Sequence, residues 1–148
     1  PALWWPVVAR NKKAITLDLR QPEGQQVLRE LVEKADFLIE NFRPGSMQRL
    51  GYGWESLHAR YPRLIYAATS GFGHSGPYAQ RPAYDMVVQA MGGIMSLTGA
   101  PDGEPMRYPV PISDMTVGLY ALIGILAALY VARLDRGPYL AFFGKEAA

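Results

Sequence analysis

Apolar and polar residues alternate along residues 14–19, "AITLDL", and this period of two predicts a β-strand. The spacing then becomes helical, because residues 22–35 carry one apolar stripe made of Val27, Leu28, Leu31, Val32 and Ala35. Pro22 suits the first turn of that helix, where its missing N–H costs nothing. Residues 36–41, "DFLIEN", form a short apolar run that predicts a buried strand. Strand, helix and strand in this order predict a parallel β-α-β unit.

The rest of the chain predicts helices, turns and one further strand. We expect short helices in residues 42–51 and 54–62, which end at a glycine and a proline respectively. Residues 63–70, "RLIYAATS", predict a third strand. Residues 84–99 predict a helix despite a pair of internal glycines, and a long apolar helix is expected from Asp114.

The long helix is the one segment that suggests a membrane. Residues 115–132 carry no charge, and their length is at the lower limit for a membrane-spanning helix. They lack aromatic belts on both flanks, and Gly124, Ala128 and Ala132 recur every four residues, which suits close packing in a soluble core. We therefore expect no membrane and keep the anchored protein as an alternative.

Composition narrows the function classes. The chain has 148 residues, of which 49% are apolar and 19% charged, as in one globular domain. It has no cysteine, which excludes disulfides and cysteine nucleophiles, and its two histidines lack zinc-site spacing, so we expect no metal. A net charge of +2 without basic runs does not indicate nucleic-acid binding. No signal peptide precedes the domain, so a cytoplasmic location is expected.

Gly71, Gly73 and Gly76 spell G-x-G-x-x-G after a predicted strand, the formal fingerprint of a dinucleotide-binding loop. That fingerprint requires a helix to begin at the glycines, but Pro77 and Pro82 follow them. No acidic residue stands about twenty positions later, where a ribose ligand is needed. We therefore expect a tight, mobile loop whose backbone can approach a ligand.

Three ordered segments carry a resemblance. They are residues 40–51, "ENFRPGSMQRLG", residues 64–93, "LIYAATSGFGHSGPYAQRPAYDMVVQAMGG", and residues 102–129, "DGEPMRYPVPISDMTVGLYALIGILAAL". In this order they resemble the class III CoA-transferases, or CaiB/BaiF family, which includes formyl-CoA and carnitine CoA-transferases and the related α-methylacyl-CoA racemases. The resemblance runs from about Arg10 to Arg136.

The resemblance implies an α/β fold with a doubly wound parallel sheet of Rossmann-like type that ends in the long apolar helix. It implies a homodimer whose two chains interlock. Residues 1–136 would be part of the family's large domain, without its first β-α-β unit and without the second domain, and residues 137–148 form an atypical tail. We accordingly expect a fragment with exposed apolar surface that associates or dissolves poorly, and whose activity alone is open.

Asp114 matches the family's catalytic aspartate. The resemblance implies that its carboxylate attacks an acyl-CoA thioester and forms a mixed anhydride, which the CoA thiolate converts to an aspartyl-CoA thioester that the acceptor acid then attacks. A carboxylate at a helix N-terminus is a chemically sound nucleophile for acyl transfer, and backbone N–H groups there can stabilise an oxyanion. The alternative is an ordinary N-cap, since aspartate is favoured at that position.

Asn41, Phe42 and Arg49 match a family segment that contacts the CoA nucleotide and pantetheine. The guanidinium of Arg49 is suited to a phosphate. The alternative for Arg49 is a favourable interaction with the C-terminus of its own helix, which ends at Gly51.

Lys12 and Lys13 match a basic segment near the nucleotide phosphates, and the alternative for them is a solvated turn. Tyr84 matches a residue beside the thioester, and the alternative is a tyrosine in the core. The racemases have a histidine at this position for proton transfer. A tyrosine is a poor base near neutral pH, which favours transfer.

The resulting hypothesis is transfer of coenzyme A from an acyl-CoA thioester to a carboxylic acid, with the thioester as substrate and no permanently bound cofactor. An acyl-CoA racemase that acts at the α-carbon is one alternative. A non-catalytic module that only binds CoA is the other.

Overall fold

The computed structural model describes residues 3–135 of the chain. The chain divides into two compact units, the first ending at Leu31 and the second beginning at Val32. The predicted tail, residues 137–148, lies outside the described residues.

The first unit begins with the short helix α1 (Trp5–Val8). Residues 14–19 form no strand, so the prediction of a strand there, and of a β-α-β unit that starts with it, is wrong. The side chain of Ile15 is exposed on this segment. Alternation alone does not make a strand, because a strand also needs a hydrogen-bonded neighbour, and none of the described residues pairs with this segment.

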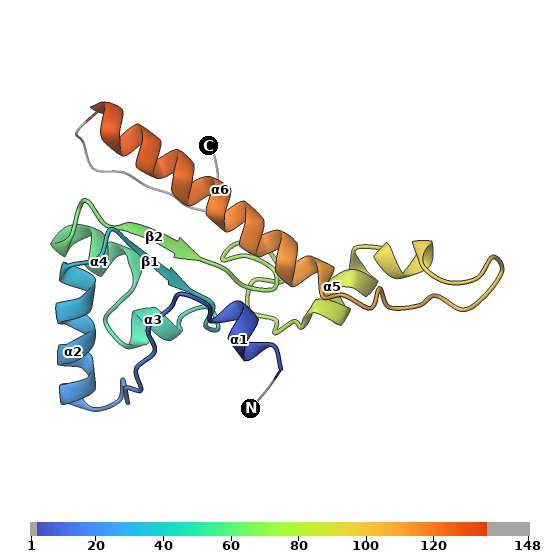
Figure 1. Cartoon of the computed structure of the whole chain (residues 1–148), viewed down its shortest axis with the longest axis horizontal. Helices are drawn as coiled ribbons and strands as arrows, with labels where there is room; N and C mark the ends of the chain where they lie inside the picture. The colour runs from blue at the N-terminus through green and yellow to red at the C-terminus, as the bar shows by residue number, and fades with distance from the viewer. Residues whose placement is uncertain (1–2, 136–148) are drawn as a thin grey trace. The chain divides into compact units, whose positions relative to one another are not determined.

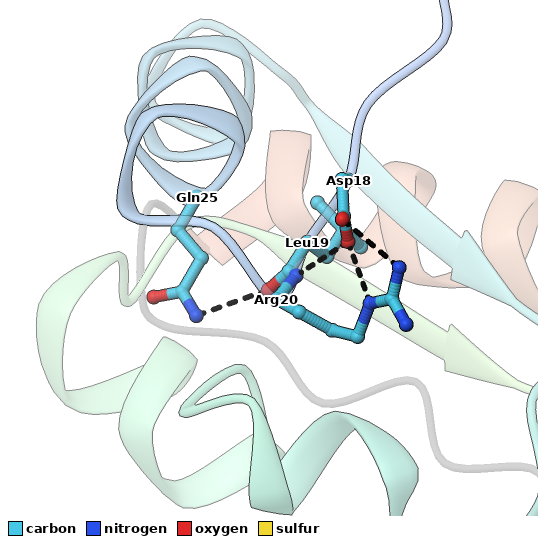
Figure 2. A network of polar contacts seen from close by, with 4 residues as sticks. All are labelled: Asp18, Leu19, Arg20 and Gln25. Carbon is cyan, nitrogen blue, oxygen red and sulfur yellow. Dashed lines mark hydrogen bonds and ion pairs between the residues drawn. The ribbon is translucent and has the colours of Figure 1, made fainter.

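Helix α2 (Pro22–Glu33) begins at Pro22 as predicted. Figure 2 shows the turn that leads into it: the carboxylate of Asp18 accepts hydrogen bonds from the backbone N–H and the guanidinium of Arg20, at 2.9 to 3.0 Å. These bonds lower the pKa of Asp18 to about 2. Gln25 donates from its side-chain amide to the Leu19 carbonyl at 3.0 Å, so the turn is joined to the first helical turn.

The second unit is built on two parallel strands, β1 (Phe37–Glu40) and β2 (Ile65–Ala68), which confirms the strands predicted in residues 36–41 and 63–70. Phe37 pairs with Ile65 and Glu40 with Ala68. The crossover between the strands contains the predicted short helices, α3 (Ser46–Arg49) and α4 (Trp54–Arg60).

Strand β2 is buried along its whole length and has helices on both faces (Figure 1). On one face Ile65 and Ala67 form a core cluster with Ile125 and Ala128 of helix α6 (Ile112–Asp135). On the other face the Tyr66 ring lies 6.5 Å from the Trp54 ring of α4. The predicted α/β class, with a parallel sheet and a long final apolar helix, is therefore confirmed.

Helix α6 contacts the sheet through a stripe that shares Ala128 with the predicted one but not Gly124 or Ala132. The buried residues on it are Ala121, Ile125 and Ala128, whereas Gly124 and Ala132 are only half-buried. The four-residue repeat therefore identified one residue of the packing face, and the larger side chain of Ile125 completes the contact with β2.

Helix α6 also exposes large apolar side chains on its remaining faces: Met115, Leu119, Tyr120, Leu122, Ile123, Leu126 and Tyr130. The expected exposed apolar surface is thus confirmed. Residues 112–133 have the length and composition of a membrane-crossing helix. The core helix of a soluble protein can have the same length and composition, so this feature is weak evidence for a membrane.

The helix predicted over residues 84–99 is interrupted. Helix α5 (Asp85–Met91) ends before the glycine pair, and a 3₁₀ turn, η1 (Ile94–Leu97), follows. Gly93 has φ of 80°, a left-handed conformation that cannot continue an α-helix.

Candidate active site

A broad open groove of about 1240 Å³ lies in the second unit, where the carboxyl ends of β1 and β2 meet the first turns of α6. Its polar end is formed by the segments that follow the strands, Asn41–Pro44 and Thr69–Gly71, together with residues 81–84 and 112–114. Its apolar end runs between β1 and α6, over Ile39 and Leu122. Ligands of open parallel sheets bind at this edge, because the loops there carry the variable side chains.

The groove brings together four of the predicted site residues: Asn41, Phe42, Tyr84 and Asp114. They come from three separate segments of the chain, after β1, before α5 and in the first turn of α6. Their shared position agrees with a common site.

Asp114 is exposed and is the third residue of α6, because the helix begins two residues earlier than predicted. The alternative of an ordinary N-cap therefore does not hold. Tyr84 is 82% exposed, so it is not part of the core formed by the described residues. Both residues line the groove.

Asn41 connects the ends of the two strands. Its side-chain amide donates to the backbone carbonyl and to the hydroxyl of Thr69, both at 2.9 Å. Beneath it the buried Glu40 accepts from the backbone N–H of Phe42 at 2.6 Å and from the hydroxyl of Tyr66 at 3.1 Å. Burial, and then the charge of Glu40, raise the pKa of Tyr66. These bonds fix the backbone that presents Asn41 and Phe42.

The remaining predicted residues lie elsewhere. Arg49 is outside the groove, and its guanidinium donates to the Ser46 hydroxyl of the same helix at 3.0 Å. Lys12 and Lys13 belong to the first unit and line a small hollow of about 160 Å³ there. The ammonium of Lys12 donates to the Val8 carbonyl at 2.6 Å.

Sequence reasoning missed two cationic residues of the groove, Arg43 and Arg81. The guanidinium of Arg81 lies 4.9 Å from the ring centre of Tyr78, a cation–π contact that orients it. Arg43 directly follows Phe42, which the sequence predicts to contact CoA. This adjacency is the sequence feature that could have identified Arg43. Among residues 3–135 no cluster of three or more acidic or histidine side chains could hold a metal ion.

The glycine loop does not form a dinucleotide fingerprint, because no helix begins there and the next one starts at Asp85. Gly73 and Gly76 adopt φ of 76° and 88°, so they make turns. Gly71 has a different constraint: a Cβ placed on it would lie 2.6 Å from the Cβ of Ala83. Two walls of the groove therefore approach each other as closely as glycine permits.

We expect Gly71→Ala to destabilise the protein by about 1–3 kcal/mol, because the added methyl forces the neighbouring segment 81–84 outward. Its displacement moves Arg81 and Tyr84, so ligand affinity should fall as well. The measurement is chemical denaturation together with calorimetry of CoA binding.

The matched control moves the methyl group from one wall to the other. In the double variant Gly71→Ala/Ala83→Gly the total number of Cβ atoms at the contact is unchanged, so most of the stability should return. A Gly71→Ala variant as stable as the parent would show that the contact is loose.

The sequence of this chain is similar to those of known CoA-transferases. The sequence profile described as CoA-transferase family III matches residues 1–139. A succinyl-CoA–D-citramalate CoA-transferase of Chloroflexus aurantiacus is 49% identical over 128 residues, which are 86% of this chain and 32% of that protein. An acetyl-CoA:oxalate CoA-transferase of Acetobacter aceti is 47% identical over 141 residues, which are 94% of this chain and 36% of that protein.

A solved structure agrees with the sequence matches. The crystal structure of a CaiB/BaiF family protein from Brucella suis superimposes with a TM-score of 0.83 at 46% identity, covering 87% of this chain and 34% of that one. The chain spans about a third of the length of the curated relatives it matches. The matched profile covers nearly the whole sequence, and the chain therefore belongs to CoA-transferase family III.

Proposed function

We propose that this chain is the part of a CoA-transferase that carries its nucleophile, and that the enzyme moves coenzyme A from an acyl-CoA to a carboxylic acid. The observation that supports this most is the exposed carboxylate of Asp114 in the first turn of α6, at the polar end of the groove. The names of the relatives, which act on succinyl-CoA with D-citramalate and on acetyl-CoA with oxalate, agree with this class of substrates.

The proposed reaction needs one protein carboxylate. Asp114 attacks the thioester carbonyl, the C–S bond breaks, and a mixed anhydride and CoA thiolate result. The thiolate attacks the aspartyl carbonyl of the anhydride, which releases the donor acid and leaves an aspartyl-CoA thioester. The acceptor carboxylate then attacks this thioester, the C–S bond breaks, and a second anhydride and free CoA thiolate result. The thiolate finally attacks the acceptor carbonyl, which yields the new acyl-CoA and restores Asp114.

The lining of the groove suits such a substrate. Phe42 and Ile39 offer apolar surface to the pantetheine chain, and Arg43 and Arg81 place positive charge for anionic groups. Tyr84, which lines the same groove as Asp114, favours transfer over racemisation, because a phenol is a poor base for an α-proton. Lys12, Lys13 and Arg49 stay in the proposal as nucleotide contacts on the resemblance alone.

The proposal extends to the assembly. We propose that residues 1–136 belong to the large domain of the complete enzyme and that two chains interlock as a cytoplasmic homodimer, without a membrane or nucleic-acid partner. The apolar side chains exposed on α6 support the proposal that other parts of the complete enzyme cover this helix.

The test is a transfer assay on the longest native polypeptide that contains these residues, with a panel of acyl-CoAs and carboxylic acids and with products identified by mass spectrometry. We expect a new acyl-CoA, and in a single turnover we expect an acceptor labelled with heavy oxygen in its carboxylate to leave one label in the peptide that contains Asp114. Exchange of an α-proton in deuterated water without an acceptor acid would instead indicate a racemase. Bound CoA without either reaction would indicate a binding module.

A further inference from the structure

The geometry points to a positioning device for Asp114 on helix α5: Asp85 and Gln89, whose side chains together hold the segment 108–114. This inference rests on the proposed function for its catalytic meaning. Neither residue lines the groove, so both act through the backbone that they bind.

Asp85 acts on the beginning of α6. One oxygen of its half-buried carboxylate accepts from the backbone N–H of Ser113 at 2.9 Å and from that of Asp114 at 3.4 Å. The first N–H groups of a helix have no partner within the helix, so a carboxylate from another helix fulfils the role of an N-cap. The other carboxylate oxygen accepts from the side-chain amide of Gln89 at 2.5 Å.

Gln89 lies one turn later on α5 and is 0% exposed. Its amide oxygen accepts from the backbone N–H of Tyr108 at 2.9 Å, and its amide nitrogen lies 3.4 Å from the Tyr108 carbonyl and 3.3 Å from that of Val110. A buried amide is costly unless it is hydrogen-bonded, so this side chain specifies one position of the segment.

The segment needs such support because of its prolines. Pro109 and Pro111 have no N–H to donate, and regular pairing by the backbone is therefore interrupted on both sides of Val110. Asp85 also follows Tyr84 directly in the chain. Asp85 is thus joined to Tyr84 along the chain and to the backbone of Asp114 by a hydrogen bond.

Exchange of donors and acceptors tests the device. Asp85→Asn brings an amide donor opposite the donor of Gln89, and Gln89→Glu brings a second carboxylate opposite Asp85, so either single variant should loosen the segment. The double variant Asp85→Asn/Gln89→Glu restores a donor facing an acceptor between the two side chains and keeps an acceptor for the Tyr108 N–H, but the new carboxylate oxygen faces the Tyr108 and Val110 carbonyls, so recovery should be partial. We expect kcat of the longest native form to fall about 100-fold in each single variant with KM for acyl-CoA little changed, because Asp114 is misplaced and the ligand contacts remain. The double variant should recover about tenfold.

Hydrogen–deuterium exchange provides a readout that does not depend on activity. The amides of Tyr108, Ser113 and Asp114 should exchange faster in both single variants and slow again in the double variant, whereas Asp102→Asn, an exposed substitution of the same type, should change nothing. Unchanged protection in the single variants, or no recovery in the double variant, overturns the inference. If a single variant does not fold, a folded double variant that regains part of this protection supports the inference and an unfolded one overturns it.

The two proposals fail in different ways. If the parent protein transfers no CoA, the proposed function is wrong and amide exchange alone decides whether Asp85 and Gln89 hold the segment. If the parent is active and both single variants keep parental kcat, the positioning role is wrong and the proposed function stands.

Discussion

The variant Asp114→Asn is expected to lose CoA transfer by roughly 10⁴- to 10⁶-fold in kcat, the range for removal of a covalent nucleophile. An amide has nearly the shape of a carboxylate but is not nucleophilic enough to open a thioester. The backbone N–H of residue 114 still donates to Asp85, so the start of α6 should keep its position. Measurement combines the transfer assay with thermal unfolding, in which the variant should match the parent.

Asp102→Asn is the matched control for this result. Asp102 is exposed, lies in the loop before the long helix and has φ of 61°, a conformation that asparagine tolerates. It should keep full activity. Transfer that persists in Asp114→Asn, and also in Asp114→Ala, would show that another group attacks the thioester, and the heavy-oxygen label would then appear in a different peptide.

The sequence predicted those elements whose signals are local. The apolar runs in residues 36–41 and 63–70 became β1 and β2, and Pro22 marked the first residue of α2. The segment 14–19 has a regular alternation of apolar and polar residues but forms no strand. The alternation describes the two faces of a single strand and does not show whether a neighbouring strand is there to pair with it. Pairing depends on parts of the chain that lie far away in the sequence.

The glycine pair shows a second limit. Apolar spacing continued across residues 92 and 93 and favoured one helix, yet the left-handed conformation of Gly93 ends α5 and redirects the chain into η1. Glycine is compatible with a helix at a cost of about 1 kcal/mol, so composition leaves both outcomes open.

The candidate site was predictable where a motif could be matched. Asn41, Phe42, Tyr84 and Asp114 were assigned from the resemblance, and the structure places them around one groove. Gln89 could not be found in this way, because in sequence it is an ordinary polar position on a short helix. Its significance comes from complete burial and from partners about twenty residues away.

Burial at the centre of α6 leads to the second large effect, on stability. Ile125 is 3% exposed and packs with Ile65 and Ala67 of β2, so Ile125→Ala should lower the free energy of unfolding by about 2–5 kcal/mol through lost apolar contact and a residual cavity. Leu126, the next residue, is 56% exposed, and the same truncation there should change stability by no more than about 0.5 kcal/mol in this 148-residue chain. Urea denaturation of both variants measures the difference.

The same pair of variants links stability to the site. Because α6 carries Asp114 in its first turn and Ile125 in the part held by the sheet, loosening of Ile125 should reduce CoA transfer as well as stability. If further protein covers the outer face of α6 in the longest native form, Leu126→Ala should there lower the free energy of unfolding by an amount close to that of Ile125→Ala. Equal costs already in the 148-residue chain would contradict the packing of α6 on β2, whereas a neutral Leu126→Ala in both forms would leave that face open to solvent.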